Sequence, residues 1–215
     1  MSKLLSEFIG TFLLVCAVVG SGIMATNLTD DVGLQLVINT ISTVAALFVL
    51  ISLFAQISGA HFNPVVSLYV VWQKQISVST SLQYSIVQII GAICGAEFAE
   101  LMFHESLGNF SQKVRSGTGL WISEILATAV LVIIISFALK NKIKASVVVP
   151  AWIGAGYLFT SSTIFANPAV TIGRAFSDSF AGIHPNSTIG FIIAQLIGLI
   201  IGSVISNSIH KDSNV

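Results

Sequence analysis

Six long apolar runs constrain this sequence more than any other feature. Each is close to the roughly 20 residues that an α-helix needs to cross the ~30 Å hydrocarbon core of a bilayer. Charged residues make up 8% of the chain, against about 25% in an ordinary soluble domain, too few to cover a surface that faces water. The sequence therefore predicts an all-α membrane protein, a single domain over 1–215 with six transmembrane helices. The predicted spans are 4–25, 33–57, 81–103, 119–140, 144–162 and 188–209.

Two shorter apolar segments, 63–73 and 167–177, each begin with the dipeptide Asn-Pro. A helix of that length rises about 16 Å, roughly half of the hydrocarbon core. Proline is tolerated at the first helical position, and asparagine is among the best N-caps. The dipeptides Asn63-Pro64 and Asn167-Pro168 therefore predict two re-entrant half-helices.

The two halves of the chain repeat each other. "SEFIGTFLLV" matches "SEILATAVLV", "HFNPVVSL" matches "FANPAVTI", and "IVQIIGAICG" matches "IAQLIGLIIG", in the same order along the chain. We therefore expect one repeat at about 1–103 and a second at about 118–210. Because each repeat holds three spans, an odd number, the second must lie inverted in the membrane. The half-helices then enter from opposite faces and meet near the midplane.

The paired breaks predict a narrow pore for neutral, hydrogen-bonding solutes. Irregular backbone at that depth is tolerated where it is buried in protein or lines a water-filled cavity. The Asn63 and Asn167 amides would supply donors at the midpoint, and the helix N-termini would repel cations. The segments before the breaks would supply carbonyl acceptors from Gly59, Ala60, His61, Phe62, Thr163, Ile164, Phe165 and Ala166.

Composition argues against nucleic-acid binding, enzyme activity and a metal or cofactor site. The net charge is zero with no basic stripe, which argues against nucleic acid as a partner. The four histidines are scattered singly, and Cys16 and Cys94 form no C-x-x-C pair. We therefore expect no enzyme activity, no cofactor and no metal, with both cysteines as buried packing residues.

An ion-coupled secondary transporter is the alternative, because inverted repeats and broken helices occur in such carriers too. Carriers usually need intramembrane charges that bind the driving ion. The deeply placed acids are Glu7 and Glu124, at equivalent positions in the repeats, and we expect each to accept hydrogen bonds from the nearby broken-loop backbone. Glu97 and Glu100 are expected at the outer vestibule or a subunit interface.

The positions of the lysine and arginine residues predict the orientation of the chain in the membrane. The side of the membrane with both termini has more of them, so the positive-inside rule puts both termini in the cytoplasm of a cell (inner or plasma) membrane. The opposite side holds Lys113 and Arg115. The cytoplasmic set is Lys3, Lys74, Lys140, Lys142, Lys144 and Lys211.

Matched G-x-x-x-G pairs recur on the third and sixth spans. They are Gly91 with Gly95 and Gly198 with Gly202. In lipid such pairs let helix backbones approach closely. Their recurrence predicts internal packing of one half against the other, with an oligomer contact as the other reading.

The sequence resembles the aquaporin, or major intrinsic protein, family over nearly its whole length. "ISGAHFNPVVSL" and "FANPAVTIGRAF" carry the paired signature, and the Glu-bearing first and fourth spans fit as well. The resemblance implies one pore per subunit, four associated subunits in the bilayer, and Asn63 and Asn167 as donors of the central constriction. The expected function is a passive channel for water and small uncharged solutes.

The outer filter departs from the family pattern. The family usually carries an arginine directly after the second Asn-Pro-Ala, whereas here Val170 stands there and Arg174 follows four residues later. Either the charge has moved outward by one turn, about 6 Å, or Arg174 is an anchor that pairs with Asp178. The family's spacing implies further filter residues at Thr43, Ile164 and one of Ala155, Gly156 or Tyr157.

Thr43, Ile164 and Val170 imply a wider and less polar ring than a strict water filter. We therefore expect water to pass together with larger uncharged solutes. "FANPAVTIGRAF" resembles bacterial members associated with arsenic-resistance operons. That resemblance implies arsenite-type metalloid hydroxides or methylated arsenicals, with glycerol as the simpler option.

Overall fold

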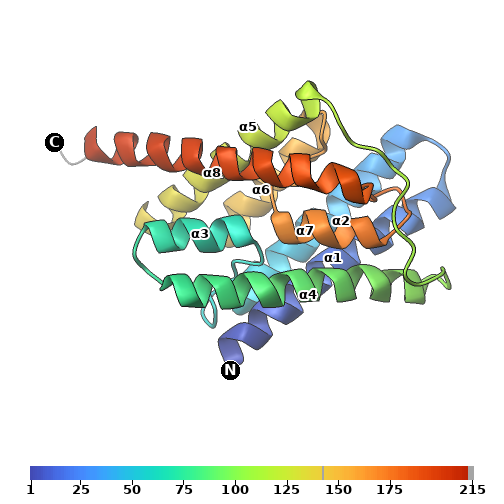
Figure 1. The fold of residues 1–215 in the computed structure, drawn as a ribbon, viewed down its shortest axis with the longest axis horizontal. Coiled ribbons are helices and arrows are strands. Elements are labelled where there is room, and N and C mark those ends of the chain that lie inside the picture. Colours follow the sequence, from blue (N-terminus) through green and yellow to red (C-terminus); the bar gives the residue numbers. More distant parts are fainter. Residues whose placement is uncertain (142, 213–215) are drawn as a thin grey trace.

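The computed structural model describes residues 1–141 and 143–212, with the backbone alone for 211 and 212. Lys142 and the side chain of Lys211 therefore lie outside the described residues. Within them the regular elements are helices (Figure 1). In chain order they are α1 (Ser2–Leu28), α2 (Val32–Phe54), α3 (Pro64–Trp72), α4 (Val78–Met102), α5 (Thr118–Asn141), α6 (Ala145–Phe159), α7 (Pro168–Gly173), the 3₁₀ helix η1 (Arg174–Phe176) and α8 (Pro185–Asp212).

Five helices, α1, α2, α4, α5 and α8, are long and apolar enough to cross a membrane. The predicted span 144–162 differs, because α6 has 15 helical residues, a rise of about 22 Å. The helix ends where Thr160 becomes extended, with φ −93° and ψ 141°. The residues after Thr160 form the turn back toward α7. The Thr160 hydroxyl connects the end of α6 to this turn. It donates to the Gly156 carbonyl at 2.6 Å and accepts from the Ile164 N–H at 3.0 Å.

The two half-helices lie in one row between α4 and α8 (Figure 1). Asn63 and Asn167 are extended N-caps, each with φ −157°, and a proline follows each. The Asn63 Oδ1 atom accepts from the Val65 N–H at 2.9 Å. In the second repeat α7 is shorter than the predicted 167–177, because the last turn tightens into η1.

The glycine pairs join helices within each repeat, so the prediction that they pack one half against the other is wrong. A Cβ atom added at Gly91 would lie 2.6 Å from the Phe8 carbonyl oxygen on α1. A Cβ atom added at Gly198 would lie 2.6 Å from the Ile125 carbonyl oxygen on α5. The glycines thus allow α4 to pack closely on α1 and α8 on α5.

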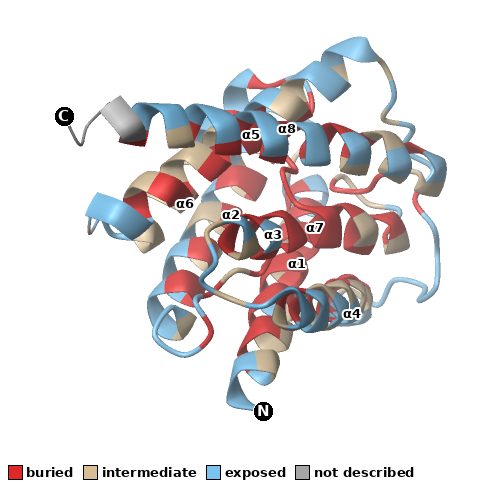
Figure 2. Ribbon diagram, turned by 60° about the vertical axis from the view of Figure 1, so that its left-hand side comes forward, coloured by how far each residue is buried: buried red, intermediate tan, exposed pale blue. Residues whose placement is uncertain are grey.

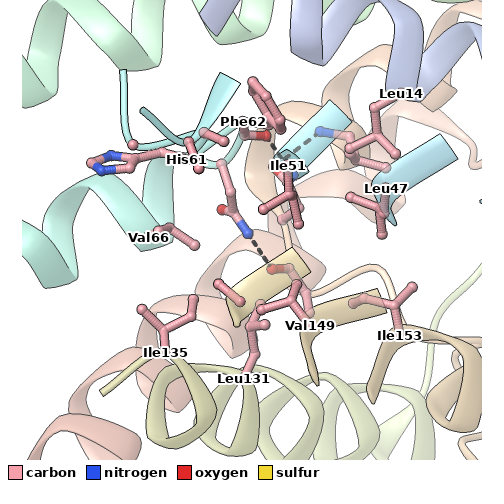
Figure 3. Close-up of a pocket in the computed structure, with 18 of the residues that line it drawn as sticks. Leu14, Leu47, Ile51, His61, Phe62, Val66, Leu131, Ile135, Val149 and Ile153 are labelled. Carbon is pink, nitrogen blue, oxygen red and sulfur yellow. Dashed lines mark hydrogen bonds between the residues drawn. The ribbon is translucent and has the colours of Figure 1, made fainter. Parts of the chain in front are cut away.

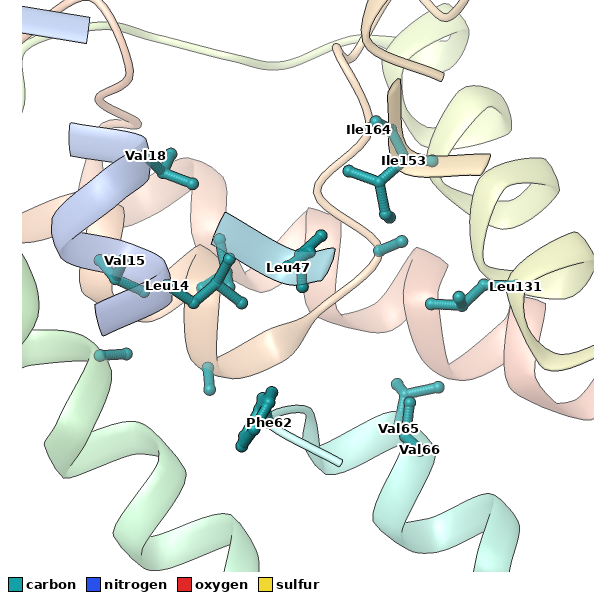
Figure 4. Packing of buried hydrophobic residues seen from close by; sticks show 14 of the residues in the cluster. Leu14, Val15, Val18, Leu47, Phe62, Val65, Val66, Leu131, Ile153 and Ile164 are labelled. Carbon is teal, nitrogen blue, oxygen red and sulfur yellow. The ribbon is translucent and has the colours of Figure 1, made fainter. Parts of the chain in front are cut away.

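Contact between the repeats comes from an apolar core around the half-helices. Buried residues concentrate on α1, α3 and α7, while the outer faces of the long helices are exposed (Figure 2). Cys94 lies on such an exposed face of α4, so the expectation of a buried side chain is confirmed for Cys16 and wrong for Cys94. Figure 4 shows the core, which includes Leu14, Val15, Val18, Leu47, Phe62, Val65, Val66, Leu131, Ile153 and Ile164.

Candidate functional site

The two asparagines are linked by a reciprocal pair of hydrogen bonds across the repeats. The Asn63 side-chain amide donates to the Ala166 carbonyl at 2.8 Å. The Asn167 side-chain amide donates to the Phe62 carbonyl, also at 2.8 Å. Each amide therefore binds the residue that precedes the other asparagine, which holds the two helix N-termini together.

The segments that lead into the half-helices have the same unusual backbone in both repeats. Three residues in each segment have positive φ, at four, three and one positions before the asparagine. Non-glycine residues in this region cost about 1–3 kcal/mol each and persist where the surroundings hold them. The φ values are 94° at Gly59, 50° at Ala60, 48° at Phe62, 60° at Thr163, 42° at Ile164 and 46° at Ala166.

Glu7 holds the first of these segments. Its side chain is fully buried. Its Oε1 atom accepts from the His61 N–H at 3.0 Å and from the Ser58 hydroxyl at 2.6 Å. Its Oε2 atom accepts from the Phe62 N–H at 2.7 Å and from the Gln88 amide at 2.8 Å.

Glu124 makes the equivalent contacts in the second repeat and is also fully buried. It accepts from the Phe165 and Ala166 N–H groups, both at 2.8 Å. It also accepts from the Gln195 amide at 2.7 Å. Hydrogen bonds to an ionised acceptor are stronger than neutral ones, so each carboxylate stabilises a strained segment beside an asparagine.

A cavity of about 340 Å³ runs past both asparagines. It reaches Gln75 and Leu139 at one end and Arg174 at the other. Much of its wall is apolar (Figure 3), as Leu47, Ile135 and Val149 illustrate. The polar part of the lining includes the segments predicted to supply carbonyls, with Gly59, Ala60, His61, Phe62, Ile164, Phe165 and Ala166. Thr163 is not among the lining residues.

The predicted filter residues Thr43, Tyr157, Ile164, Val170 and Arg174 all line this cavity. The Thr43 Oγ1 atom lies 3.3 Å from the Tyr157 hydroxyl, so α2 and α6 approach each other there.

Of the three residues left open on α6, Tyr157 is the one that lines the cavity. Ala155 is exposed, and Gly156 packs against the Ile164 side chain.

Arg174 faces the cavity and does not pair with Asp178. Its Nε atom donates to the Ala181 carbonyl at 2.5 Å, and its guanidinium lies 3.5 Å from the centre of the Phe165 ring. Asp178 accepts instead from the Gln112 N–H at 2.8 Å. Only 2% of the Arg174 surface is exposed, so its charge is buried at the end of the cavity opposite Gln75 and Leu139.

The family model described as Major intrinsic protein matches residues 1–166 of the 215 in the chain. The chain belongs to the major intrinsic protein family. It is therefore an integral membrane protein and a channel, not an enzyme. Among the described residues, no group of three or more His, Cys, Asp or Glu side chains could hold a metal ion.

Named relatives in the major intrinsic protein family cover most of the chain. Aquaglyceroporin AqpS of Rhizobium meliloti (strain 1021) is 44% identical over 199 residues, which are 92% of this chain and 85% of that protein. Aquaporin TIP2-1 of Arabidopsis thaliana is 31% identical over 219 residues, covering 95% of this chain and 87% of that protein. The X-ray structure of the aquaglyceroporin from Plasmodium falciparum has the same fold, with a TM-score of 0.71 and 22% identity over 95% of this chain and 93% of that one.

Two glutamines of this major intrinsic protein were missed from sequence. Gln88 and Gln195 connect each glutamate to its own half-helix. Gln88 donates to the Ser67 hydroxyl at 3.2 Å, and Gln195 donates to the Thr171 hydroxyl at 3.0 Å. A signal was present, because the same glutamine occurs in both copies of the third repeated motif, in the middle of an apolar run.

Proposed function

We propose that this chain is a passive channel for water and small uncharged solutes, with glycerol among them. The observation that carries this proposal is the position of the Asn63 and Asn167 side chains, which line one cavity and each donate at 2.8 Å to the carbonyl group that precedes the other asparagine. Two helix N-termini add partial positive charge at that point, which disfavours cations. Neutral solutes that exchange hydrogen bonds with amides and carbonyls suit such a lining.

The alternative, an ion-coupled carrier, has little support from the buried acids. The carboxylate oxygens of Glu7 and Glu124 already accept hydrogen bonds from backbone N–H groups and from glutamine. An acid that binds a driving ion has to exchange its partners during transport. Here that exchange would release the strained segments beside the asparagines.

We further propose that the filter is widened by Val170 and admits solutes larger than water. Val170 lines the cavity with a short apolar side chain, where the family usually has an arginine. Glycerol is favoured by the 44% identical relative, whose name is aquaglyceroporin. We also propose arsenite-type metalloid hydroxides and methylated arsenicals as solutes. They too are small and hydroxylated, and they are uncharged over part of the pH range.

The proposal extends to assembly and orientation. Four subunits would associate in the bilayer, each with its own pore. Both termini would face the cytoplasm of the cell membrane, because the lysines gather on that side.

Stopped-flow light scattering on proteoliposomes tests the channel. Water, glycerol and arsenite gradients should each collapse faster than in protein-free liposomes, with rates proportional to the gradient. Flux that saturates and requires an ion gradient would instead support a carrier. A chain that speeds water alone would contradict the widened filter.

A further inference from the structure

Three cationic side chains converge on three consecutive carbonyl groups beside the end of the cavity that Arg174 lines. Lys113 donates from Nζ to Phe180 O at 2.8 Å, and Arg115 donates from Nε to Gly182 O at 2.8 Å. Arg174 donates from Nε to Ala181 O, between them. Lys113 and Arg115 come from the segment that joins the two repeats, so one cluster contains residues from two distant parts of the chain.

One aromatic ring holds both arginines close together. The Arg174 guanidinium carbon is 3.5 Å from the Phe165 ring centre, and that of Arg115 is 5.3 Å from the same centre. Both distances are within the range of cation–π attraction. Phe165 and Arg174 both line the cavity, and Arg115 lies behind them on the same ring.

The cluster has little compensating negative charge. In the described part of the chain, the hydrogen bonds of the three cations go to carbonyl groups and not to carboxylates. Asp178 accepts from the Gln112 backbone, and Glu124 attracts the arginines only from a distance while its oxygens hold the Phe165 segment. Of the three cations Arg174 is buried, Arg115 is half-buried and Lys113 is exposed. Buried charges are ordinarily paired, so the Arg174 guanidinium, whose hydrogen bond goes to a carbonyl group, calls for an anionic ligand.

We propose that Arg115, Arg174 and Lys113 form a binding site for a small carboxylate or similar oxyanion at the outer mouth of the channel. The planar guanidinium fork matches two oxygen atoms of such an anion. Because Arg174 lines the cavity, a bound anion would lie in the path of the solute and slow its passage. The flux readout rests on the proposed function, whereas direct binding does not.

The pH dependence has a defined sign. Partial desolvation of its ammonium group and the charges of Arg115 and Arg174 lower the pKa of Lys113 to about 8. Lys113 is therefore charged below pH 8 and loses its charge above it, so anion binding weakens as the pH rises through that value. The other ionisable groups near the cluster are Glu124, Tyr157, Asp178 and His184.

Sodium lactate is the probe, with sodium chloride at equal ionic strength as its reference. Glycerol flux into proteoliposomes is measured with each salt outside, and saturation-transfer NMR on the purified protein reports lactate binding directly. Lactate should slow glycerol flux more than chloride does. Arg115→Met should weaken the lactate effect about tenfold, which is the loss of one charge-assisted contact. Arg115→Lys should restore part of it.

Lys140→Gln is the matched control, because it removes an exposed cation at the other end of α5 and should leave the lactate effect unchanged. Equal flux in lactate and chloride, with no NMR signal, would overturn the proposal. So would an Arg115→Met protein that keeps the full lactate effect. If Arg115→Met fails to fold, Lys113→Met is measured instead and should weaken the lactate effect at neutral pH. Absence of glycerol flux in the unaltered protein would contradict the proposed glycerol permeation, while the NMR signal would still decide the anion site.

Discussion

The Asn63 side-chain amide lies 2.8 Å from the carbonyl oxygen of Ala166, a residue 103 positions away in the second repeat. The same contact recurs with the repeats exchanged, from Asn167 to Phe62. Each asparagine therefore has two duties, since its Oδ1 atom caps its own half-helix while its amide holds the other one. A single substitution can separate these duties.

Asn63→Asp should keep the cap and lose the donor. Either carboxylate oxygen can still accept from the Val65 N–H, but the group cannot donate to Ala166 at neutral pH. A negative charge would replace a polar donor where the helix N-termini now repel cations. We expect proton leak under a pH gradient to rise by about tenfold or more in proteoliposomes with an entrapped dye.

Asn186→Asp is the matched control for that experiment, because Asn186 is exposed outside the cavity. It should leave proton leak unchanged. Rapid leak through the unaltered protein would show that the amides and helix N-termini are not the barrier.

Glu124→Gln should destabilise the second broken segment. Glu124 accepts from the Phe165 and Ala166 N–H groups, one at each oxygen, and a glutamine can accept at only one of its two terminal atoms. One buried N–H would lose its partner next to residues with positive φ. We expect a loss of about 2 kcal/mol, seen as a lower Tm in detergent. Glu97→Gln, which alters a surface contact with the Gly108 N–H, should change the Tm little.

Much of this architecture could be predicted from sequence, because each motif occurs in both repeats and predicts the same local structure in each. A lone Asn-Pro would indicate a turn, whereas two in an inverted repeat predict half-helices. Glu7 and Glu124 were recognised through the same doubling. The end of α6 was placed too late, although the polar residues Thr160, Ser161 and Ser162 mark the point where the chain turns away from the helix.

The end of the cavity that Arg174 lines was harder to predict, because it depends on contacts between distant segments. Nothing local to Arg174 shows that its Nε binds Ala181 and that its guanidinium lies over Phe165. Spacing alone left Asp178 open as its partner. Arg115 lies in the segment between the repeats, where no motif marks it.

Gly91→Ala and Gly198→Ala should both loosen the packing of the first and third spans of their repeats. In each case the new Cβ atom would lie 2.6 Å from a carbonyl oxygen, on Phe8 or Ile125, so the helices must separate. We expect a cost of about 1–3 kcal/mol for each, measured as a lower Tm in detergent. A Cβ atom added at Gly119 would have the Ser161 Oγ atom as its nearest neighbour, at 3.9 Å, so Gly119→Ala should be neutral. Equal losses at all three positions would contradict close packing as the cause.

Val170→Arg should narrow the channel for large solutes more than for water. Val170 lines the cavity one turn before Arg174, and a guanidinium at that position would extend into the space that we assign to glycerol. We expect glycerol flux to fall by about tenfold or more while water flux changes by less than about threefold, both measured by stopped-flow light scattering. Val170→Leu adds volume without charge and should affect both fluxes less. Loss of water and glycerol flux in equal proportion would place the filter elsewhere, since a block at a shared point cannot separate the two solutes by size.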